Sequence, residues 1–489
     1  MPVNNCEYKM KKSKQFKYFL LAIFLFLAIL IVVHAIKSSY FNLIKRDEFK
    51  CVNCNVILIS IDALRADHLG IYGYERNTSP NIDNFAKKAY VFNNSISQSG
   101  STVYSLPSFH TSKLPITDNL TNGFVLKEEP TTIAEILKEH QYHTYAIVSH
   151  EYAKSKYGCA QGFEIFDENY SEYGFADLTT EKVINLLNKT VEQPFFLWIH
   201  YREPHSPYNP PERIFNIFNN QFKKNMSENG ESRQYYKQKI EEIYAKNISE
   251  KNNRNTYVIL GKEMHLEEKD INWLKNAYDG NIYFVDEQLG ILFNYLNESG
   301  ILKNTVVIIT ADHGESLGEH NIFDHNILSY GVIHTPLIVY LPEHSGSIIN
   351  YPVSNLDILP TILDVTNLNT SLDFRGKSVF DRQRKDYIQF AEYPNYATII
   401  KDGWQLFVNN HSSKTCDPNS DRLFYIINDT DENFNLADEN IAMCNYLKNL
   451  NYGIREAYYN NSFYEELNKN IINADNETIK KLKAVGYVN

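Results

Sequence analysis

Two long apolar runs, far apart in the chain, each lead directly into acidic residues. The first is NVILISID at 55–62 and the second is TVVIITADHGE at 305–315. Continuous apolar runs of this length are typical of parallel strands that are buried on both faces of a sheet. Because ligands of α/β sheets gather at the carboxyl ends of the strands, Asp62, Asp312 and His313 are predicted to lie at a functional edge.

The segments around these runs alternate between helical and extended patterns. Ser79-Pro80 opens a helix that is predicted to continue through FAKKAYVF, and Thr132 with Glu135 forms the capping box of another helix. This alternation predicts an α/β fold, with a doubly wound mixed sheet flanked by helices. The other predicted elements are strands at 143–150 and 194–201, helical excursions over 212–268 and a long amphipathic helix at 271–296.

A smaller C-terminal subdomain is predicted to follow the large domain. From about residue 385 the apolar runs become shorter, which indicates a small antiparallel sheet followed by a helical tail. The predicted boundaries are 52–380 for the large domain and 381–489 for the subdomain. With 489 residues, of which 43% are hydrophobic, the chain is long enough to bury a core in both parts.

The chain opens with a basic segment and an uncharged apolar run. Five lysines lie between residues 9 and 17, ahead of YFLLAIFLFLAILIVVHAI at 18–36. This run is close to the roughly 20 residues that a helix needs to cross a bilayer, although a cleaved signal peptide is the alternative. An uncleaved anchor is favoured by the length, with 1–17 in the cytoplasm, a linker at 37–51 and the remainder extracytoplasmic.

The net charge excludes one class of binding partner, and the cysteines indicate the redox state of the compartment in which the chain folds. A formal net charge of −11 argues against a nucleic-acid partner, since nucleic-acid binding normally requires a basic face. Cys51 and Cys54 have a CxxC spacing, which is a weak zinc signal without a second such pair. A disulfide that involves one of these cysteines, or Cys416 with Cys444, is typical of an oxidising compartment. Five cysteines follow the apolar run, so one is left over and the pairing stays open.

Carboxylate and imidazole side chains form a candidate cation site. Asp62, Asp312 and His313 lie at predicted strand ends, and His205 and His325 lie in polar loops that can return to the same edge. This mixed ligand set is typical of a divalent cation, and the histidine favours zinc or manganese over calcium. Each residue alone has an ordinary structural interpretation, as a helix cap or a core histidine. Their shared placement favours a functional site.

Several motifs, taken in order, resemble those of the sulfatase family within the alkaline phosphatase superfamily. The resemblance extends over roughly 52–440 and implies an alkaline-phosphatase-like fold with one divalent cation held by Asp62, Asp312 and His313. It also implies that His205 and His325 bind the substrate oxyanion or protonate the leaving group. Ser105 and His200 are further candidates for substrate binding. The motifs are NVILISIDALRADHLGIYGY, HYREPHSPYNPP, YDGNIYFVD, TADHGESLGEH and RLFYIINDTDENFNLADEN.

The nucleophile is where the chain departs most from that family. Active sulfatases convert a Cys or Ser in C/S-x-P-S-R into formylglycine, and SLPSF at 105–109 imitates this motif with Phe109 in place of the arginine. An alignment counted back from Thr111-Ser112 instead places Thr102 at the nucleophile, with Ser105 behind it. TVYSLP also resembles the T-x-x-S-x-P stretch of phosphoethanolamine transferases, in which an unmodified threonine attacks phosphorus. Thr102 is therefore favoured as nucleophile and cation ligand, and formylglycine is disfavoured because oxidation of threonine gives a ketone.

Three functions are consistent with these residues. The leading hypothesis is a membrane-anchored, extracytoplasmic hydrolase that cleaves sulfate or phosphate esters of a glycan or lipid and attacks through Thr102. A phospho-alcohol transferase that modifies a surface glycan or lipid is the second. A non-catalytic glycan-binding protein is the third, because Ala63 stands where many sulfatases carry a second acid. Retention of buried charged groups argues against this third hypothesis, since such groups cost stability without a function.

Overall fold

The computed structural model describes residues 49–168, 175–189, 191–206, 208–218, 256–259, 262–381, 384, 387–409 and 413–459. The predicted anchor at 18–36 lies outside the described residues, as do its flanks up to residue 48 and the chain after residue 459. Within the described part, no helix is both long and apolar enough to cross a membrane. The compact unit that carries the candidate site begins at Cys51.

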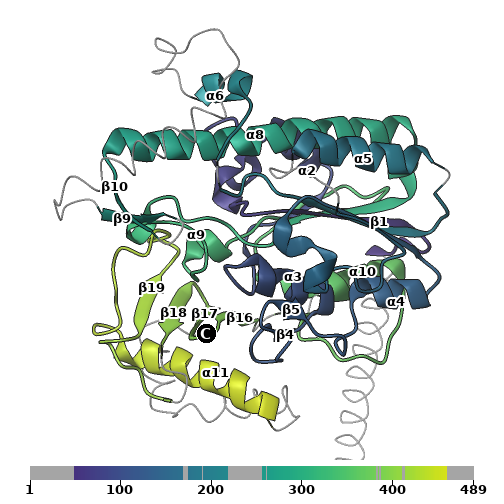
Figure 1. The fold of residues 1–489 in the computed structure, drawn as a ribbon. Coiled ribbons are helices and arrows are strands. Elements are labelled where there is room, and N and C mark those ends of the chain that lie inside the picture. The colour runs from purple at the N-terminus through teal and green to yellow at the C-terminus, as the bar shows by residue number, and fades with distance from the viewer. Residues whose placement is uncertain are drawn as a thin grey trace, which may run out of the picture. The chain divides into compact units, whose positions relative to one another are not determined.

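An eight-stranded mixed sheet forms the centre of this unit (Figure 1). The five neighbouring strands from β11 to β7 run parallel, whereas β13 pairs with β11 in the antiparallel sense. This arrangement confirms the predicted doubly wound mixed sheet. In spatial order the strands are β14 (Ile348–Ile349), β2 (Tyr90–Phe92), β13 (Leu337–Tyr340), β11 (Thr305–Ala311), β1 (Asn55–Ile61), β8 (Phe195–Tyr201), β6 (His143–Val148) and β7 (Ile165–Asp167).

The register of the central strands aligns their carboxyl ends. Ile61, at the end of β1, pairs with Ala311 of β11 on one side and with Tyr201 of β8 on the other. On the next pair of strands, Val148 of β6 lies opposite His200 of β8. The residues that follow these four strands therefore emerge side by side at one edge of the sheet.

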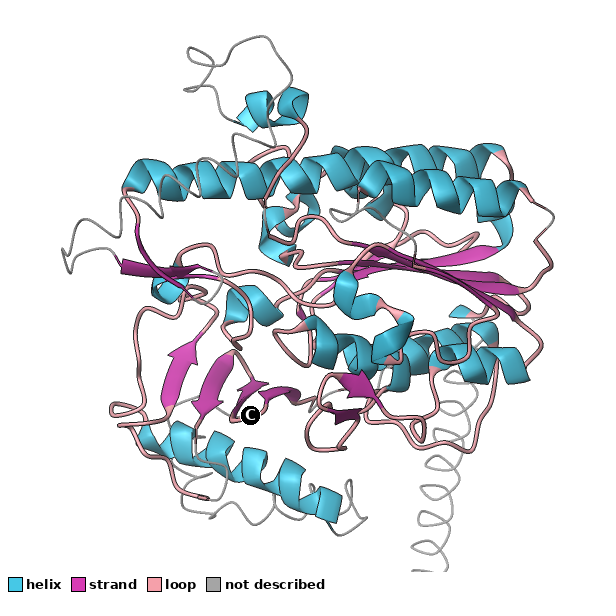
Figure 2. Cartoon of the chain, viewed as in Figure 1, coloured by secondary structure: helices cyan, strands magenta, loops and turns pink. Residues whose placement is uncertain are grey.

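Helices cover both faces of the sheet (Figure 2). One face packs against α2 (Pro80–Ala86), α5 (Ala176–Asn188) and α8 (Glu268–Glu298), and the other against α3 (Thr102–Thr111), α4 (Ile133–Glu139) and α10 (Ile358–Thr366). Alternate residues of β1, such as Ile57 and Ile59, share a hydrophobic cluster with Trp273 and Tyr278 of α8. The predicted capping box is present at the start of α4, where the Thr132 side chain accepts from the Glu135 amide.

The C-terminal part contains a four-stranded antiparallel sheet and a helix, as predicted. The sheet consists of β16 (Gln389–Tyr393), β17 (Tyr396–Lys401), β18 (Trp404–Val408) and β19 (Arg422–Tyr425), and α11 (Ile441–Tyr459) packs against it. A disulfide joins Cys416 to Cys444 of α11, and a second joins Cys51 to Cys54. Cys159 is the odd cysteine and is buried.

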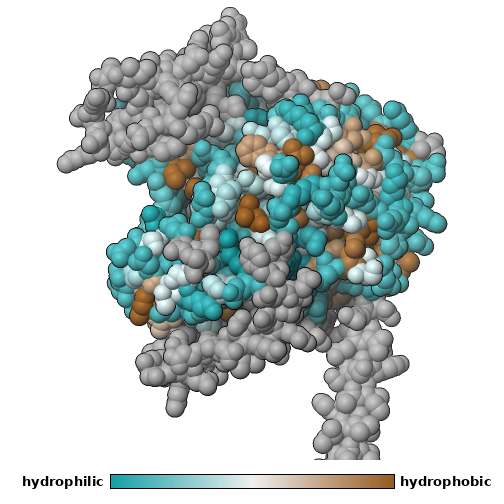
Figure 3. Space-filling view, turned by 60° about the horizontal axis from the view of Figure 1, so that its bottom comes forward, coloured by the Kyte–Doolittle hydropathy of each residue, from teal (hydrophilic) through white to brown (hydrophobic). Residues whose placement is uncertain are grey.

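Short elements connect these layers. They are β3 (Ser95–Ile96), β4 (Thr121–Asn122), β5 (Val125–Leu126), α6 (Glu212–Phe218), β9 (Thr256–Ile259), β10 (Lys262–His265), β12 (Ile322–Phe323), α9 (Tyr330–Ile333) and β15 (Val353–Ser354). The face turned forward in Figure 3 is mainly hydrophilic, with apolar residues in small separate groups, as is usual for a solvent-facing surface.

Two predicted segments differ in the structure. The helix predicted to run through FAKKAYVF ends at Ala86, and Tyr90–Phe92 forms β2. The reason is tertiary pairing, because β2 lies between β13 and β14 at the edge of the sheet. In the polar segment 212–268, α6 is helical as predicted, but β9 and β10 form an antiparallel pair that continues into β12.

Candidate active site

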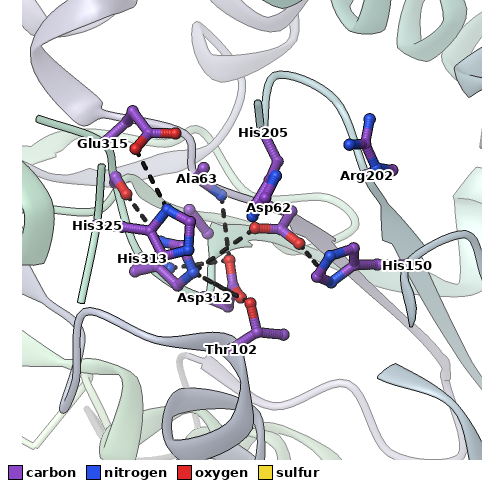
Figure 4. A network of polar contacts seen from close by, with 12 residues as sticks. Asp62, Ala63, Thr102, His150, Arg202, His205, Asp312, His313, Glu315 and His325 are labelled. Carbon is purple, nitrogen blue, oxygen red and sulfur yellow. Dashed lines mark hydrogen bonds and ion pairs between the residues drawn. The ribbon is translucent and has the colours of Figure 1, made fainter. Parts of the chain in front are cut away.

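The carboxyl ends of β1 and β11 bring three predicted cation ligands together (Figure 4). Asp62 directly follows β1, and Asp312 with His313 directly follows β11. All three side chains are fully buried. His313 Nε2 lies 3.6 Å from Asp62 Oδ1 and 3.5 Å from Asp312 Oδ2, so two distant parts of the sequence present their ligand atoms to one point.

The ring of His313 is oriented by its own loop. Its Nδ1–H donates to the carbonyl of Gly314 over 2.8 Å, which leaves Nε2 with a free electron pair on the side of the carboxylates. The Thr102 hydroxyl lies 3.1 Å from this Nε2. A metal-binding histidine is usually fixed in place by a hydrogen bond from the ring nitrogen that does not bind the metal.

Thr102 occupies the first position of α3, directly after its N-cap Ser101. The amino end of a helix carries partial positive charge, which stabilises negative charge on or near the Thr102 oxygen. Gly100 precedes this turn, and a side chain there would collide with the carbonyl of Ile327. Glycine therefore lets the loop that carries His325 approach the start of α3.

The alternative nucleophile lies one turn further along α3. Ser105 is buried, and its hydroxyl has no hydrogen-bond partner among the described residues. Phe109, which replaces the arginine of the formylglycine motif, is fully buried with its ring centroid 6.5 Å from that of Trp198 in β8. In the described structure, it is Thr102 rather than Ser105 that contacts His313, the predicted cation ligand.

Each carboxylate of this group has a buried oxygen that accepts no hydrogen bond within the described structure. Asp62 Oδ1 and Asp312 Oδ2 are buried and accept no hydrogen bond from the described residues, whereas Asp312 Oδ1 accepts from the amides of Ala63 and His313. Burial raises the pKa of Asp62, but nearby His150 holds it well below its usual range, so the group is ionised. Two buried carboxylates side by side cost free energy unless a cation lies between them. Two carboxylates, an imidazole and a hydroxyl fit a divalent cation.

His325 lies next to His313 and is positively charged. The two imidazole rings stack with their centroids 4.6 Å apart, and His325 Nδ1 lies 3.2 Å from Glu315 Oε1. Burial lowers the pKa of His325, but the Glu315 carboxylate outweighs this effect and raises that pKa to about 9. His325 therefore carries a proton at neutral pH that a substrate oxygen can accept.

His205 faces the same point in the opposite protonation state. Its Nδ1–H donates to the carbonyl of Ser206 over 2.6 Å, and its ring centroid lies 4.7 Å from that of His325. Burial and the adjacent charge of His325 hold the pKa of His205 well below its usual value, although Asp62 opposes them. His205 is therefore neutral, with a free electron pair on Nε2.

Two residues that the sequence analysis did not single out also belong to the site. His150 follows β6, and its Nδ1 lies 2.8 Å from Asp62 Oδ2, while Glu315 orients His325. The signal for His150 was present, because HTYAIVSH ends in a polar residue just as the runs at Asp62 and Asp312 do. His200, predicted to bind substrate, is fully buried in β8 with its Nε2 3.5 Å from Asp62 Oδ2.

This fold and this edge of the sheet define an alkaline-phosphatase-like hydrolase. The chain belongs to the sulfatase family, whose family model matches residues 54–368. It is 24% identical over 427 residues to an arylsulfatase of Clostridium perfringens, covering 71% of this chain and 84% of that protein. It is also 24% identical over 416 residues to an N-acetylglucosamine-6-O-sulfatase of Bacteroides thetaiotaomicron, covering 70% and 74%.

A solved structure shares the fold over most of the chain. It is a protein in complex with its substrate D-glucosamine-2-N,6-O-disulfate, with a TM-score of 0.68 and 20% sequence identity. The superposition covers 84% of this chain and 99% of that one. The large sheet and the small C-terminal sheet described above are therefore those of the alkaline-phosphatase-like sulfatase fold.

Proposed function

We propose that the chain is a metal-dependent hydrolase of sulfate or phosphate esters in which the Thr102 hydroxyl is the nucleophile. The observation that carries this proposal is the 3.1 Å contact between Thr102 Oγ1 and His313 Nε2 at the start of α3. The buried oxygens Asp62 Oδ1 and Asp312 Oδ2 support it, because neither accepts a hydrogen bond from the described residues and a cation would satisfy both. A divalent cation bound by these residues lowers the pKa of a coordinated hydroxyl and neutralises charge on the ester oxygens.

The first half of the reaction uses Thr102 and His325. The Thr102 hydroxyl releases its proton to solvent water as its oxygen forms a bond to the sulfur or phosphorus atom, and the bond from that atom to the ester oxygen breaks. His325 donates its proton to the departing oxygen, which leaves as an alcohol. The products of this step are the free alcohol and a sulfate or phosphate ester of Thr102.

The second half uses the neutral His205. A water molecule attacks the sulfur or phosphorus atom, the bond to Thr102 breaks, and His205 Nε2 accepts a proton from the water. Sulfate or phosphate is released, the proton on His205 passes to the departing Thr102 oxygen and restores its hydroxyl, and His325 regains a proton from solvent water. The opposite pKa shifts of His205 and His325 support this division into base and acid.

The pH profile of turnover is expected to depend on His325. Because the protonated form is the acid and its pKa is raised to about 9, kcat should stay level below that pH and fall as the pH rises through about 9. Glu315→Gln removes the carboxylate that holds this proton, so the alkaline fall should move to lower pH. Steady-state kinetics between pH 6 and 10 measure both profiles. An alkaline fall at the same pH in both proteins would contradict the assignment.

Relatives of the chain suggest the substrate class. Their names refer to sulfated sugars, including N-acetylglucosamine-6-O-sulfatase and iduronate 2-sulfatase. Near the candidate site, the rings of Tyr104 and Tyr393 lie 5.6 Å apart between centroids, and the Tyr393 hydroxyl donates to the Asn326 side chain next to His325. Aromatic rings with a polar tip pack well against sugar rings. We therefore propose a sulfated or phosphorylated glycan as the substrate.

Replacing Tyr393 by alanine is expected to raise KM for an oligosaccharide ester by roughly 3- to 10-fold, the equivalent of about 1 kcal/mol for one aromatic contact. We expect a small aryl ester to bind without contacting Tyr393, so its kcat/KM should not change. Phe434→Ala, at a side chain that is 69% exposed in another part of the chain, is the matched control. Equal effects on both substrates would contradict a role in glycan binding.

A panel of substrates tests the proposed function as a whole. Purified full-length chain is incubated with an aryl sulfate, an aryl phosphate, an aryl-free sulfated oligosaccharide and a phospholipid, with and without a chelator. We expect turnover of at least one ester that stops in the chelator. A failure to turn over any ester with any divalent metal would contradict the proposal and favour a non-catalytic glycan-binding protein.

A phospho-alcohol transferase is the second candidate. The unmodified hydroxyl of Thr102 favours it, because a threonine ester can be resolved by an acceptor alcohol as well as by water. The apolar run at 18–36 supports a membrane tether with an extracytoplasmic catalytic domain close to such acceptors. Transfer of a labelled phospho-alcohol group from a phospholipid to a glycan, in excess of its release to water, would favour this candidate.

A further inference from the structure

A pocket outside the proposed reaction centre lies between the small C-terminal sheet and the loop that joins His325 to α9 (Figure 1). The loop contributes Ile327, Leu328 and Ser329 to one wall. Because Ile327 is two residues from His325, their Cα atoms lie within about 7 Å of each other. The volume of the pocket is about 210 Å³. Pockets for whole drug-sized ligands measure roughly 300–1,000 Å³, so this one suits a single unit of a larger ligand.

The opposite wall is one face of the C-terminal sheet. Arg422 of β19 pairs directly with Phe407 of β18, and Phe424 follows two residues later on the same face. Tyr396 of β17 shares this face, because Thr398, two residues further on, pairs with Phe407. The other face of the sheet packs against α11. The pocket is therefore lined by three aromatic rings and one guanidinium group.

The charges around the pocket leave Arg422 without a counter-ion. His320 Nε2 lies 2.9 Å from one oxygen of Glu432, and the other oxygen accepts from the Tyr330 amide over 2.6 Å. Burial raises the pKa of Glu432, and its bond to Glu432 raises that of His320, so the pair keeps one proton and is neutral as a unit. The exposed Arg422 forms no ion pair with a described residue. The pocket is thus positively charged, although the chain has a formal net charge of −11.

A row of aromatic rings joins this pocket to the candidate active site. The ring centroids of Tyr104, in the first turn of α3, and Tyr393 lie 5.6 Å apart, and those of Tyr393 and Tyr396 lie 5.3 Å apart. Tyr393 donates to the side chain of Asn326 and Tyr396 to its carbonyl, and Asn326 directly follows His325. A glycan that contacts Tyr393 can therefore continue past Tyr396 into the pocket.

We propose that this pocket is a second subsite for the glycan, in which Arg422 binds a sulfate or carboxylate on a sugar beside the one whose ester is cleaved. The rings of Tyr396, Phe407 and Phe424 pack against that sugar, and the planar guanidinium forms two parallel hydrogen bonds with the acidic group. The inference rests on the proposed function, since the ester that reacts lies at Thr102. The preferred substrate is then a glycan with at least two acidic groups, of which one is cleaved.

Three matched substrates test this subsite. One is an oligosaccharide whose only acidic group is the ester that is cleaved, and the others carry an additional sulfate or carboxylate on the next sugar. The wild type should have a KM about 10- to 100-fold lower for the doubly acidic substrates, because hydrogen bonds to charged groups are strong. Arg422→Gln should remove this difference and leave kcat unchanged, since the contact is remote from the reacting bond.

Two further variants show whether the charge or its geometry matters. Arg422→Lys should restore only part of the preference, because an ammonium group lacks the guanidinium fork. Arg213→Gln, at an exposed arginine of α6 that pairs with Glu287, is the matched control and should behave as the wild type. A KM preference that survives in Arg422→Gln, or its absence from the wild type, would overturn the subsite. Turnover of a small aryl ester in the same proteins would show that the proposed function still holds.

Binding without turnover gives an independent readout. Isothermal titration calorimetry of full-length Thr102→Ala with a heparin-derived tetrasaccharide measures Kd, and the same titration is made with Arg422→Gln added. We expect the second protein to bind about 10- to 100-fold more weakly at an unchanged melting temperature, since Arg422 is exposed. Equal Kd values in the two folded proteins would contradict the subsite, whether or not any ester is turned over.

Discussion

Thr102→Ala is expected to reduce ester turnover by about 10³-fold or more, because it removes the atom that forms the covalent bond to the substrate. Ser105→Ala, one turn further along the same helix, is the matched control and should retain most of the activity. The reason lies in the geometry, since Thr102 Oγ1 contacts His313 Nε2 and the Ser105 hydroxyl makes no hydrogen bond with the described residues. Initial rates on the best ester of the panel measure both effects.

The reverse result would identify Ser105 as the nucleophile. Full activity in Thr102→Ala with loss in Ser105→Ala would mean that SLPSF is the functional motif after all. Thr102→Ser is a further control, since it keeps a hydroxyl at the start of α3 and is expected to keep a measurable fraction of the activity.

Asp312→Asn is expected to abolish metal-dependent turnover, again by about 10³-fold or more, because it removes a charged ligand of the proposed cation. Chelation of the wild type should have the same effect, and added Mn²⁺ or Zn²⁺ should reverse it only in the wild type. Asp402→Asn, at a side chain that is 56% exposed, is the matched control and should be fully active. Rates with chelator and with added metal provide the measurement.

Asp312→Asn has an opposite effect on stability when metal is absent. Asp62 Oδ1 and Asp312 Oδ2 are buried without hydrogen-bond partners in the described structure, so removing one charge relieves their repulsion. In chelator, the variant should therefore melt at a higher temperature than the wild type. With metal present the order should reverse, because the bound ion stabilises only the wild-type site. A wild type that is the more stable protein in chelator would contradict the cation site.

The sequence predicts the site residues best where a candidate ligand directly follows a recognisable buried strand. The runs that became β1 and β11 are mostly apolar and buried along their whole length, and each leads into candidate ligands at its carboxyl end. The direction of parallel strands then forces Asp62 and Asp312 to one edge. His150 obeys the same rule on β6, but a single histidine after a strand is more often structural, and only its contact with Asp62 distinguishes it.

The edges of the sheet were not predictable in the same way. Tyr90–Phe92 continues the polarity pattern of a helix, and it forms a strand because β13 and β14 offer hydrogen bonds on both sides. The pair β9 and β10 likewise depends on its contact with β12, which lies far along the chain. Pairing with distant partners overrides local propensity in short strands.

The protonation states of His205 and His325 could not be predicted from the sequence either. Both are single histidines in polar loops, and the resemblance to sulfatases implied the same role for both. The structure separates them, because His325 contacts the Glu315 carboxylate while His205 donates to the carbonyl of Ser206. One carboxylate contact distinguishes the proposed acid from the proposed base.

Mass spectrometry of the peptide that contains residues 100–112 tests the central claim most directly. The peptide is compared before turnover and after acid quenching during turnover of the best ester. We expect an unmodified Thr102 before turnover, and a sulfate or phosphate group on Thr102 in the quenched sample that is absent from Asp312→Asn. An oxidised Ser105 before turnover, or an adduct on Ser105 with Thr102 unmodified, would contradict direct attack by the threonine.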